Sequence, residues 1–81
     1  MCTYETRQLR ITGSGKGAAG WFRLTDASVY LDHPVHATPE HTLNIDFLRP
    51  ADGPAARVAV ELDPDSAREL AHAILAALET S

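Results

Sequence analysis

The chain has 81 residues, 44% of them hydrophobic, and a formal net charge of -4. A chain of this length is expected to form one domain over residues 1–81 with a small core, because it hides only about 60% of its unfolded surface. The negative charge argues against a nucleic-acid partner, and no apolar run reaches the roughly 20 residues of a membrane span. One cysteine, Cys2, allows no internal disulfide, and no signal segment is evident, so we expect a cytoplasmic protein.

The first two strands are predicted on either side of a glycine-rich stretch. Alternation of polar and apolar residues predicts a strand over Thr3–Thr12. The stretch GSGKGAAG, Gly13–Gly20, has too much glycine for a strand interior and predicts a hairpin loop. Trp21–Asp32 is predicted as the second strand. Its apolar positions change parity midway, which predicts a bulge near Asp26.

The remaining chain predicts two strands and a helix. Alternating apolar residues place strands at Thr42–Arg49 and Ala56–Leu62, joined by the turn PADGPA. Asp63 is expected to cap the helix, with Pro64 at its first position. The helix carries one apolar stripe, made of Ala67, Leu70, Ala71, Ile74 and Leu78. The predicted fold is α+β, a four-stranded antiparallel meander sheet with one C-terminal helix packed on one face (ββββα).

Three of the four histidines lie in the stretch LDHPVHATPEH, between the second and third predicted strands. Neutral imidazole and thiolate are ligands that zinc and similar transition metals prefer. If the first two strands pair where residue numbers sum to about 33, Cys2 falls opposite Leu31, at the mouth of this loop. The predicted metal ligands are therefore His33, His36, His41 and Cys2, with Asp32 and Glu40 as acceptors that orient the rings.

Two other interpretations of the same edge remain open. The histidines fit an ordinary turn, in which they cap backbone groups or face water. Alternatively, Cys2 beside a histidine fits an activated thiolate in a small enzyme. The sequence does not choose between these alternatives and a metal site.

The glycine-rich stretch and the aromatic residues are further candidates for ligand sites. GSGKG resembles part of a phosphate-binding loop, but no Ser or Thr follows Lys16 and no helix is predicted next, so no nucleotide is expected. Lys16 still offers a charge for an anion. Trp21, Phe22 and Tyr30 form an aromatic row that either stacks a flat ligand or, as such rows more often do, belongs to the core and a dimer interface.

The runs GSGKGAAGWF and VYLDHPVHATPEHTLNIDF resemble a family of short, uncharacterised actinomycete proteins, known as a domain of unknown function. The resemblance covers nearly the whole chain and includes the DHPVH core at Asp32–His36. It implies no activity.

The leading functional hypothesis is a small metal-binding protein, with zinc first, and a homodimer is the expected partner arrangement. The alternative is a metal-free dimeric accessory or small-ligand-binding domain, and the third hypothesis is a small enzyme that uses the histidines or Cys2.

Overall fold

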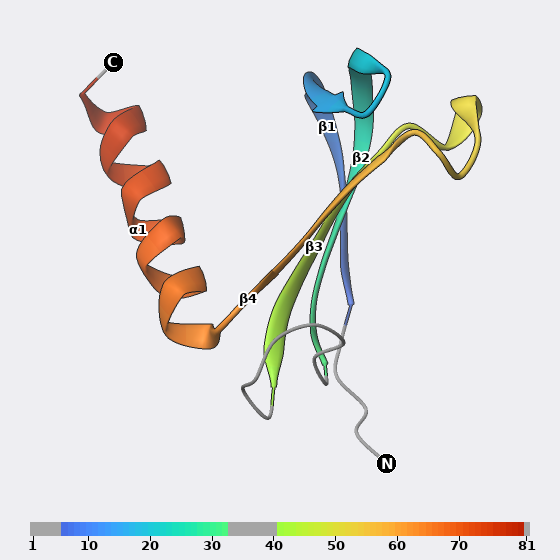
Figure 1. Ribbon diagram of the computed structural model, residues 1–81. Helices are drawn as coiled ribbons and strands as arrows, with labels where there is room; N and C mark the ends of the chain where they lie inside the picture. Colours follow the sequence, from blue (N-terminus) through green and yellow to red (C-terminus); the bar gives the residue numbers. More distant parts are fainter. Residues whose placement is uncertain (1–5, 33–40, 81) are drawn as a thin grey trace.

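Four strands and one long helix follow one another in the computed structural model, which describes residues 6–32 and 41–80 (Figure 1). The predicted α+β class and the antiparallel order β1-β2-β3-β4 are confirmed. A short 3-10 turn, η1, lies between β3 and β4. The elements are β1 (Arg7–Gly17), β2 (Gly20–Asp32), β3 (Thr42–Leu48), η1 (Pro50–Asp52), β4 (Arg57–Leu62) and α1 (Pro64–Glu79).

The central strands place their apolar residues on a single face of the sheet. Val29 lies opposite Ile45, and Ile45 lies opposite Val60. Because side chains alternate along a strand, the residues two positions away share this face. The apolar face therefore also holds Leu31, Leu43, Phe47, Val58 and Leu62. The opposite face carries mainly polar residues, among them Ser28, Tyr30, Asn44, Asp46 and Glu61.

The first hairpin is longer than predicted. β1 continues to Gly17, which pairs with Gly20, so the predicted loop over Gly13–Gly20 shrinks to a turn at Ala18 and Ala19. Gly20 has a φ of 113°, a conformation that L side chains rarely adopt. At the end of β1 glycine occupies every second position, so one face of Gly13–Gly17 carries no side chains.

The alternating glycines make room for large side chains on β2. A Cβ atom built on Gly15 would lie 3.1 Å from Leu24 Cδ1, and one on Gly17 would lie 3.3 Å from Phe22 Cε1. Leu24 therefore lies over the glycine-bearing strand and is only 7% exposed. The glycines of GSGKG thus leave one face of β1 without side chains, and Leu24 and Phe22 of β2 cover that face.

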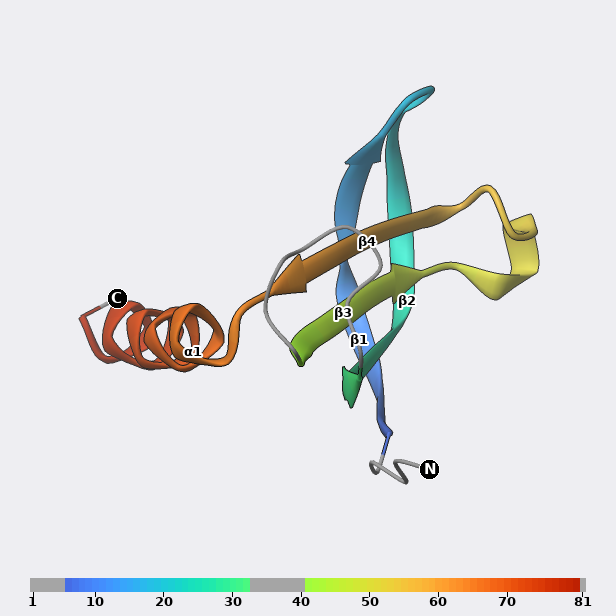
Figure 2. The ribbon, with the colours of Figure 1, turned by 60° about the horizontal axis from the view of Figure 1, so that its bottom comes forward.

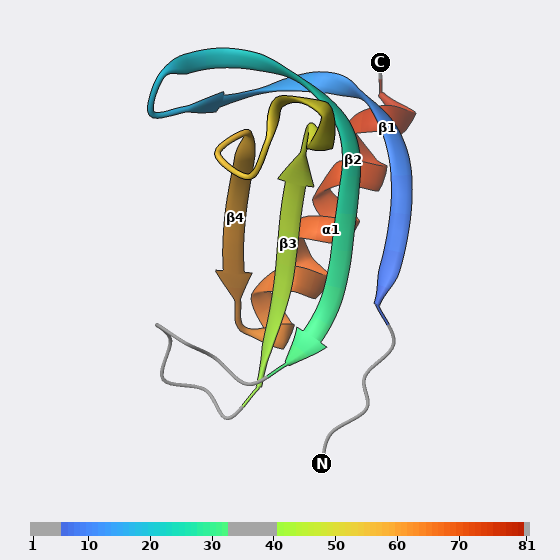
Figure 3. The ribbon, with the colours of Figure 1, turned by 90° about the vertical axis from the view of Figure 1, so that its right-hand side faces the viewer.

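The bulge occurs in β1 and not in β2. The pairing passes from Arg10–Asp26 to Gly13–Leu24, which leaves two residues of β1 against Thr25 alone. The predicted position of the bulge, near Asp26, is therefore correct along the sheet. The extra residue, however, lies in β1 and not in β2. A bulge increases local twist, and the end of the hairpin crosses the far end of β3 and β4 steeply (Figure 3).

The helix begins as predicted. Asp63 Oδ1 accepts a hydrogen bond of 2.7 Å from the backbone N–H of Ser66, and Pro64 occupies the first turn. α1 lies on one side of the sheet and stands off from it, connected through the end of β4 (Figures 1 and 2). Between residues 6–32 and 41–80, no helix is long and apolar enough to cross a membrane.

Candidate functional site

Two of the six residues predicted for the metal site lie in the described part of the chain. Asp32 is the last residue of β2 and pairs with Thr42, so His41 and Asp32 lie at the same edge of the sheet. His33, His36, Glu40 and Cys2 lie outside the described residues.

The predicted route from strand pairing to Cys2 was wrong in register. Arg7 pairs with Val29 and Leu9 with Ala27, so paired numbers sum to 36 and not to about 33. The discrepancy arises because β1 and β2 continue into the glycine stretch and turn only at Ala18. The placement of Cys2 opposite Leu31 therefore has no support.

The helix start shares the edge with Asp32 and His41, as expected. Leu62 pairs with Leu43, next to Thr42, and Asp63 follows directly. Within residues 6–32 and 41–80, no group of three or more His, Cys, Asp or Glu side chains is placed to hold a metal ion. The positions of Asp32 and His41 alone neither support nor contradict the predicted metal site.

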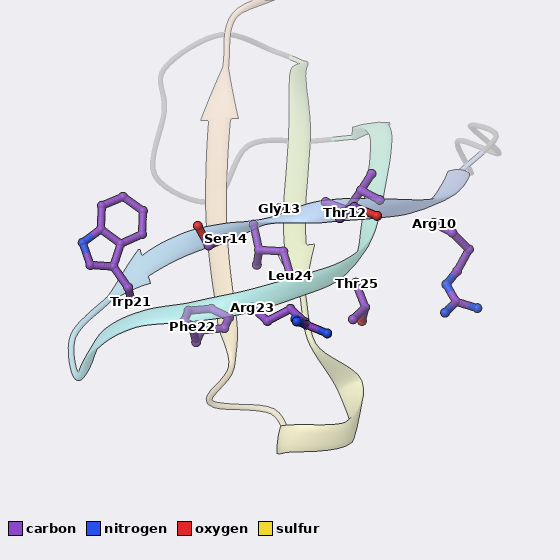
Figure 4. A pocket seen from close by; sticks show the side chains of 10 residues that line it. Arg10, Thr12, Gly13, Ser14, Trp21, Phe22, Arg23, Leu24 and Thr25 are labelled. Atoms are coloured by element: carbon purple, nitrogen blue, oxygen red, sulfur yellow. The ribbon is translucent and has the colours of Figure 1, made fainter.

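A different set of polar side chains gathers on the first hairpin. A shallow groove of about 740 Å³ runs along β1 and β2. Trp21 lies near the turn and Arg10 at the opposite end, with Arg23 and Thr25 between them on β2 (Figure 4). The polar and aromatic residues along it are Arg10, Thr12, Ser14, Trp21, Phe22, Arg23 and Thr25.

The register explains how the charged and aromatic side chains come together. Lys16 lies directly opposite Trp21, and Ser14 lies opposite Arg23. Because alternate residues share a face, these four side chains lie on one face of the hairpin. Trp21 is 71% exposed, although a large aromatic side chain is usually well covered. One hairpin face therefore combines an open indole with two cations and a hydroxyl.

The hairpin carries most of the positive charge of an acidic protein. Residues 6–25 hold four of the seven Lys and Arg residues and no Asp or Glu. Arg10 is 3.8 Å from Asp26, at the edge of this segment, and its side chain is 85% exposed. Among residues 6–32 and 41–80, no acidic side chain is paired with Lys16 or Arg23. These two charges are available to an anion.

The polar face of the sheet, in contrast, satisfies its own charges. Asp46 Oδ1 accepts hydrogen bonds from Arg57 Nε at 3.0 Å and Nη2 at 2.8 Å. The Tyr30 hydroxyl donates to Asp46 Oδ2 at 3.5 Å. Burial, and then the negative charge of Asp46, raise the pKa of Tyr30. This cluster links β2, β3 and β4 to one another and pairs the charge of Asp46 with that of Arg57.

The sequence indicated part of the hairpin groove and missed its organisation. Trp21 was predicted as one member of an aromatic row and Lys16 as a charge at a loop tip. In the structure, Trp21 and Phe22 alternate between hairpin faces, so no single row forms. The signal that was overlooked is the period of two in GSGKG, which puts Ser14 and Lys16 on the face of Trp21 and Arg23.

One comparison with known proteins identifies a relationship. A family model described as a family of unknown function, DUF6295, matches residues 1–81. The chain belongs to DUF6295. The predicted resemblance to a domain of unknown function is thereby confirmed. No curated protein and no solved structure matches this DUF6295 member.

Proposed function

We propose that the protein is an accessory domain that binds a small anionic molecule with a flat apolar part in the groove of the β1–β2 hairpin. The observation that supports this proposal most is the combination of a 71% exposed tryptophan with arginines in one groove. Neither feature is needed to complete the core, because the groove lies open on the surface. Both features suit a ligand with charge at one end and a ring at the other.

Different side chains of the groove would bind different parts of such a ligand. The indole of Trp21 offers a face on which a planar group can stack. The guanidinium group of Arg23 can donate two hydrogen bonds to one carboxylate or phosphate, and Arg does this better than Lys because its donors form a rigid fork. Ser14 and Thr25 add hydroxyl donors along the same groove. The volume of about 740 Å³ lies within the range of small-molecule sites.

The test uses the fluorescence of Trp21, which is the only tryptophan in the chain. Phenyl phosphate and benzoate are the anionic probes, and benzyl alcohol is the neutral probe of similar size. At about -0.3 kcal/mol per heavy atom, probes this small bind with dissociation constants in the millimolar range. We expect saturable quenching by one or both anions and only linear collisional quenching by benzyl alcohol. The better anion tells whether the site prefers phosphate or carboxylate.

Variants locate the binding. Arg23→Gln is expected to weaken binding of the preferred anion about 5–20-fold, because Arg23 is exposed and water reduces the contribution of its charge-assisted hydrogen bond to about 1–2 kcal/mol. Arg68→Gln removes the same charge from α1, away from the groove, and should leave the affinity unchanged. Equal losses in the two variants, or identical quenching by the anionic and neutral probes, would contradict the proposal.

A metal site at the opposite edge is the second candidate function. It is supported by the pairing of Asp32 with Thr42, which holds Asp32 and His41 at the two ends of the histidine stretch. We propose that zinc or a similar metal would be held there by His33, His36 and His41, with Cys2 as a fourth ligand. Metal analysis of untagged protein tests this idea. His36→Ala should lose the metal and His72→Ala, an exposed change on α1, should keep it; a metal-free protein contradicts it.

A further inference from the structure

An open apolar cleft separates the helix from the sheet. It has a volume of about 520 Å³ and lies between α1 and the apolar sheet face. The sheet contributes Val29, Leu31, Leu43 and Ile45, and the helix contributes Leu70 and Ile74. Figures 1 and 2 show the helix standing away from the strands. The two apolar surfaces face each other but do not close on each other.

The helix stripe is correspondingly exposed. Leu70 is 44% exposed, Ile74 52% and Leu78 66%. Leu24 and Ala27 are the only fully buried hydrophobic residues among residues 6–32 and 41–80. A single copy thus leaves several large apolar side chains of α1 in water, which the hydrophobic effect opposes.

The solvent-accessible surface of the chain is larger than that of a compact monomer of the same mass. The chain exposes 6217 Å², whereas a monomeric protein of 8.8 kDa exposes about 4,800 Å². The radius of gyration is 13.7 Å, against about 12 Å for a compact chain of this length. Since this total also counts the residues outside 6–32 and 41–80, the excess is at most about 1,400 Å² for each copy and about 2,800 Å² for a pair, and this upper value lies within the range of obligate homodimers.

We propose that a second copy of this chain occupies the cleft, so that the apolar stripe of each α1 packs against the apolar sheet face of its partner. A two-fold axis makes such an interface self-complementary, since every copy supplies one helix stripe and one sheet face. The dimensions agree: the 16 residues of α1 span about 24 Å, and the seven residues of β3 span about 23 Å. Formation of the dimer would bury the helix stripe and the apolar sheet face of both copies.

The occupant is a copy of this chain and not a small apolar ligand because of the area involved. A ligand of cleft size would cover the residues that line the cleft. It would leave Leu78 of the stripe exposed, because this residue lies beyond the lining. Only an elongated partner with its own apolar stripe covers the whole helix face. This dimer does not depend on the groove of the β1–β2 hairpin, so the two proposals can fail separately.

The first test measures the mass of the full chain by sedimentation equilibrium over a wide concentration range. We expect twice the chain mass of 8.8 kDa. Ile74→Glu places a charge in the stripe and should raise the dimer dissociation constant at least 100-fold. Ala76→Glu places the same charge on the opposite side of α1, where it should change the constant less than threefold. A monomeric parent protein, or equal effects of the two variants, would overturn the proposal.

A second measurement uses the unmodified protein, in case Ile74→Glu fails to fold. In a sample mixed from differently isotope-labelled copies, isotope-filtered NMR detects contacts between copies only. We expect cross-peaks between the methyl groups of Ile74 and those of Val29 or Leu43 on the other copy. A dimer without these cross-peaks, in which the same methyl contacts appear only in the unfiltered spectrum, would show that α1 closes on its own sheet and would overturn the proposal.

Discussion

Replacing Gly15 by valine tests the physical reason for the glycine-rich strand. A Cβ atom at this position would lie 3.1 Å from Leu24 Cδ1, closer than an ordinary van der Waals contact. Leu24 is 7% exposed and has little space into which to retreat. Overpacking of this kind costs about 1–3 kcal/mol. We therefore expect Gly15→Val to lower the free energy of unfolding by about 2 kcal/mol.

Gly13→Val is the matched control on the same face of the same strand. A Cβ atom on Gly13 has no heavy atom within 4 Å, and its φ is not positive. Valine also favours strands, so this change should be neutral or stabilising by up to about 1 kcal/mol.

Urea unfolding followed by far-ultraviolet circular dichroism, at one fixed protein concentration, measures both variants. A difference of about 2 kcal/mol corresponds to about 8–16 °C in melting temperature for a domain of this size. If Gly15→Val proves as stable as Gly13→Val, Leu24 does not cover the strand and the account of GSGKG is wrong.

Three further predictions concern ionisation and the backbone. The Tyr30 phenol should titrate above its ordinary pKa of 10.0, so its contribution to stability is present below that pH and lost as the pH rises through the raised value. The difference in ultraviolet absorbance between the parent protein and Tyr30→Phe isolates this titration, and Asp46→Asn should lower the pKa. Hydrogen bonding from Ser66 lowers the pKa of Asp63, so the cap stabilises the helix above an ordinary aspartate pKa of 3.8 and is lost as the pH falls through the lowered value. Asp63→Ala should reduce helicity at pH 7, whereas Asp63→Asn, which also caps, should retain more; equal losses would contradict the capping role. Gly20→Ala should destabilise the protein by about 1 kcal/mol or more, because its φ of 113° strains any L side chain; unchanged urea unfolding would refute this.

The second half of the fold was predictable from the sequence nearly to the residue. β3 and β4 alternate cleanly because one face is apolar and the other polar, so the period of two is visible. α1 begins at a capping aspartate followed by proline, and both signals act locally. The predicted strands Thr42–Arg49 and Ala56–Leu62 each extend one residue beyond the observed ones.

The first hairpin was not predictable by the same means. Glycine has no side chain with which to show which face is covered, so GSGKG was interpreted by composition rather than by period. The proximity of Lys16, Trp21 and Arg23 depends on the register between β1 and β2. The predicted register was wrong by three residues. Whether the helix stripe packs on its own sheet or on a partner's is equally invisible, because the same pattern of apolar residues serves both arrangements.

The most direct test of the proposed binding site is an amide chemical-shift titration with the preferred anionic probe. The account predicts shifts in the indole N–H of Trp21 and in the amides of Ser14 and Arg23, with little change along α1. Shifts confined to the residues of the apolar cleft, such as Leu43 and Ile74, or no saturable shifts at all, would contradict the assignment of the β1–β2 hairpin as the binding site.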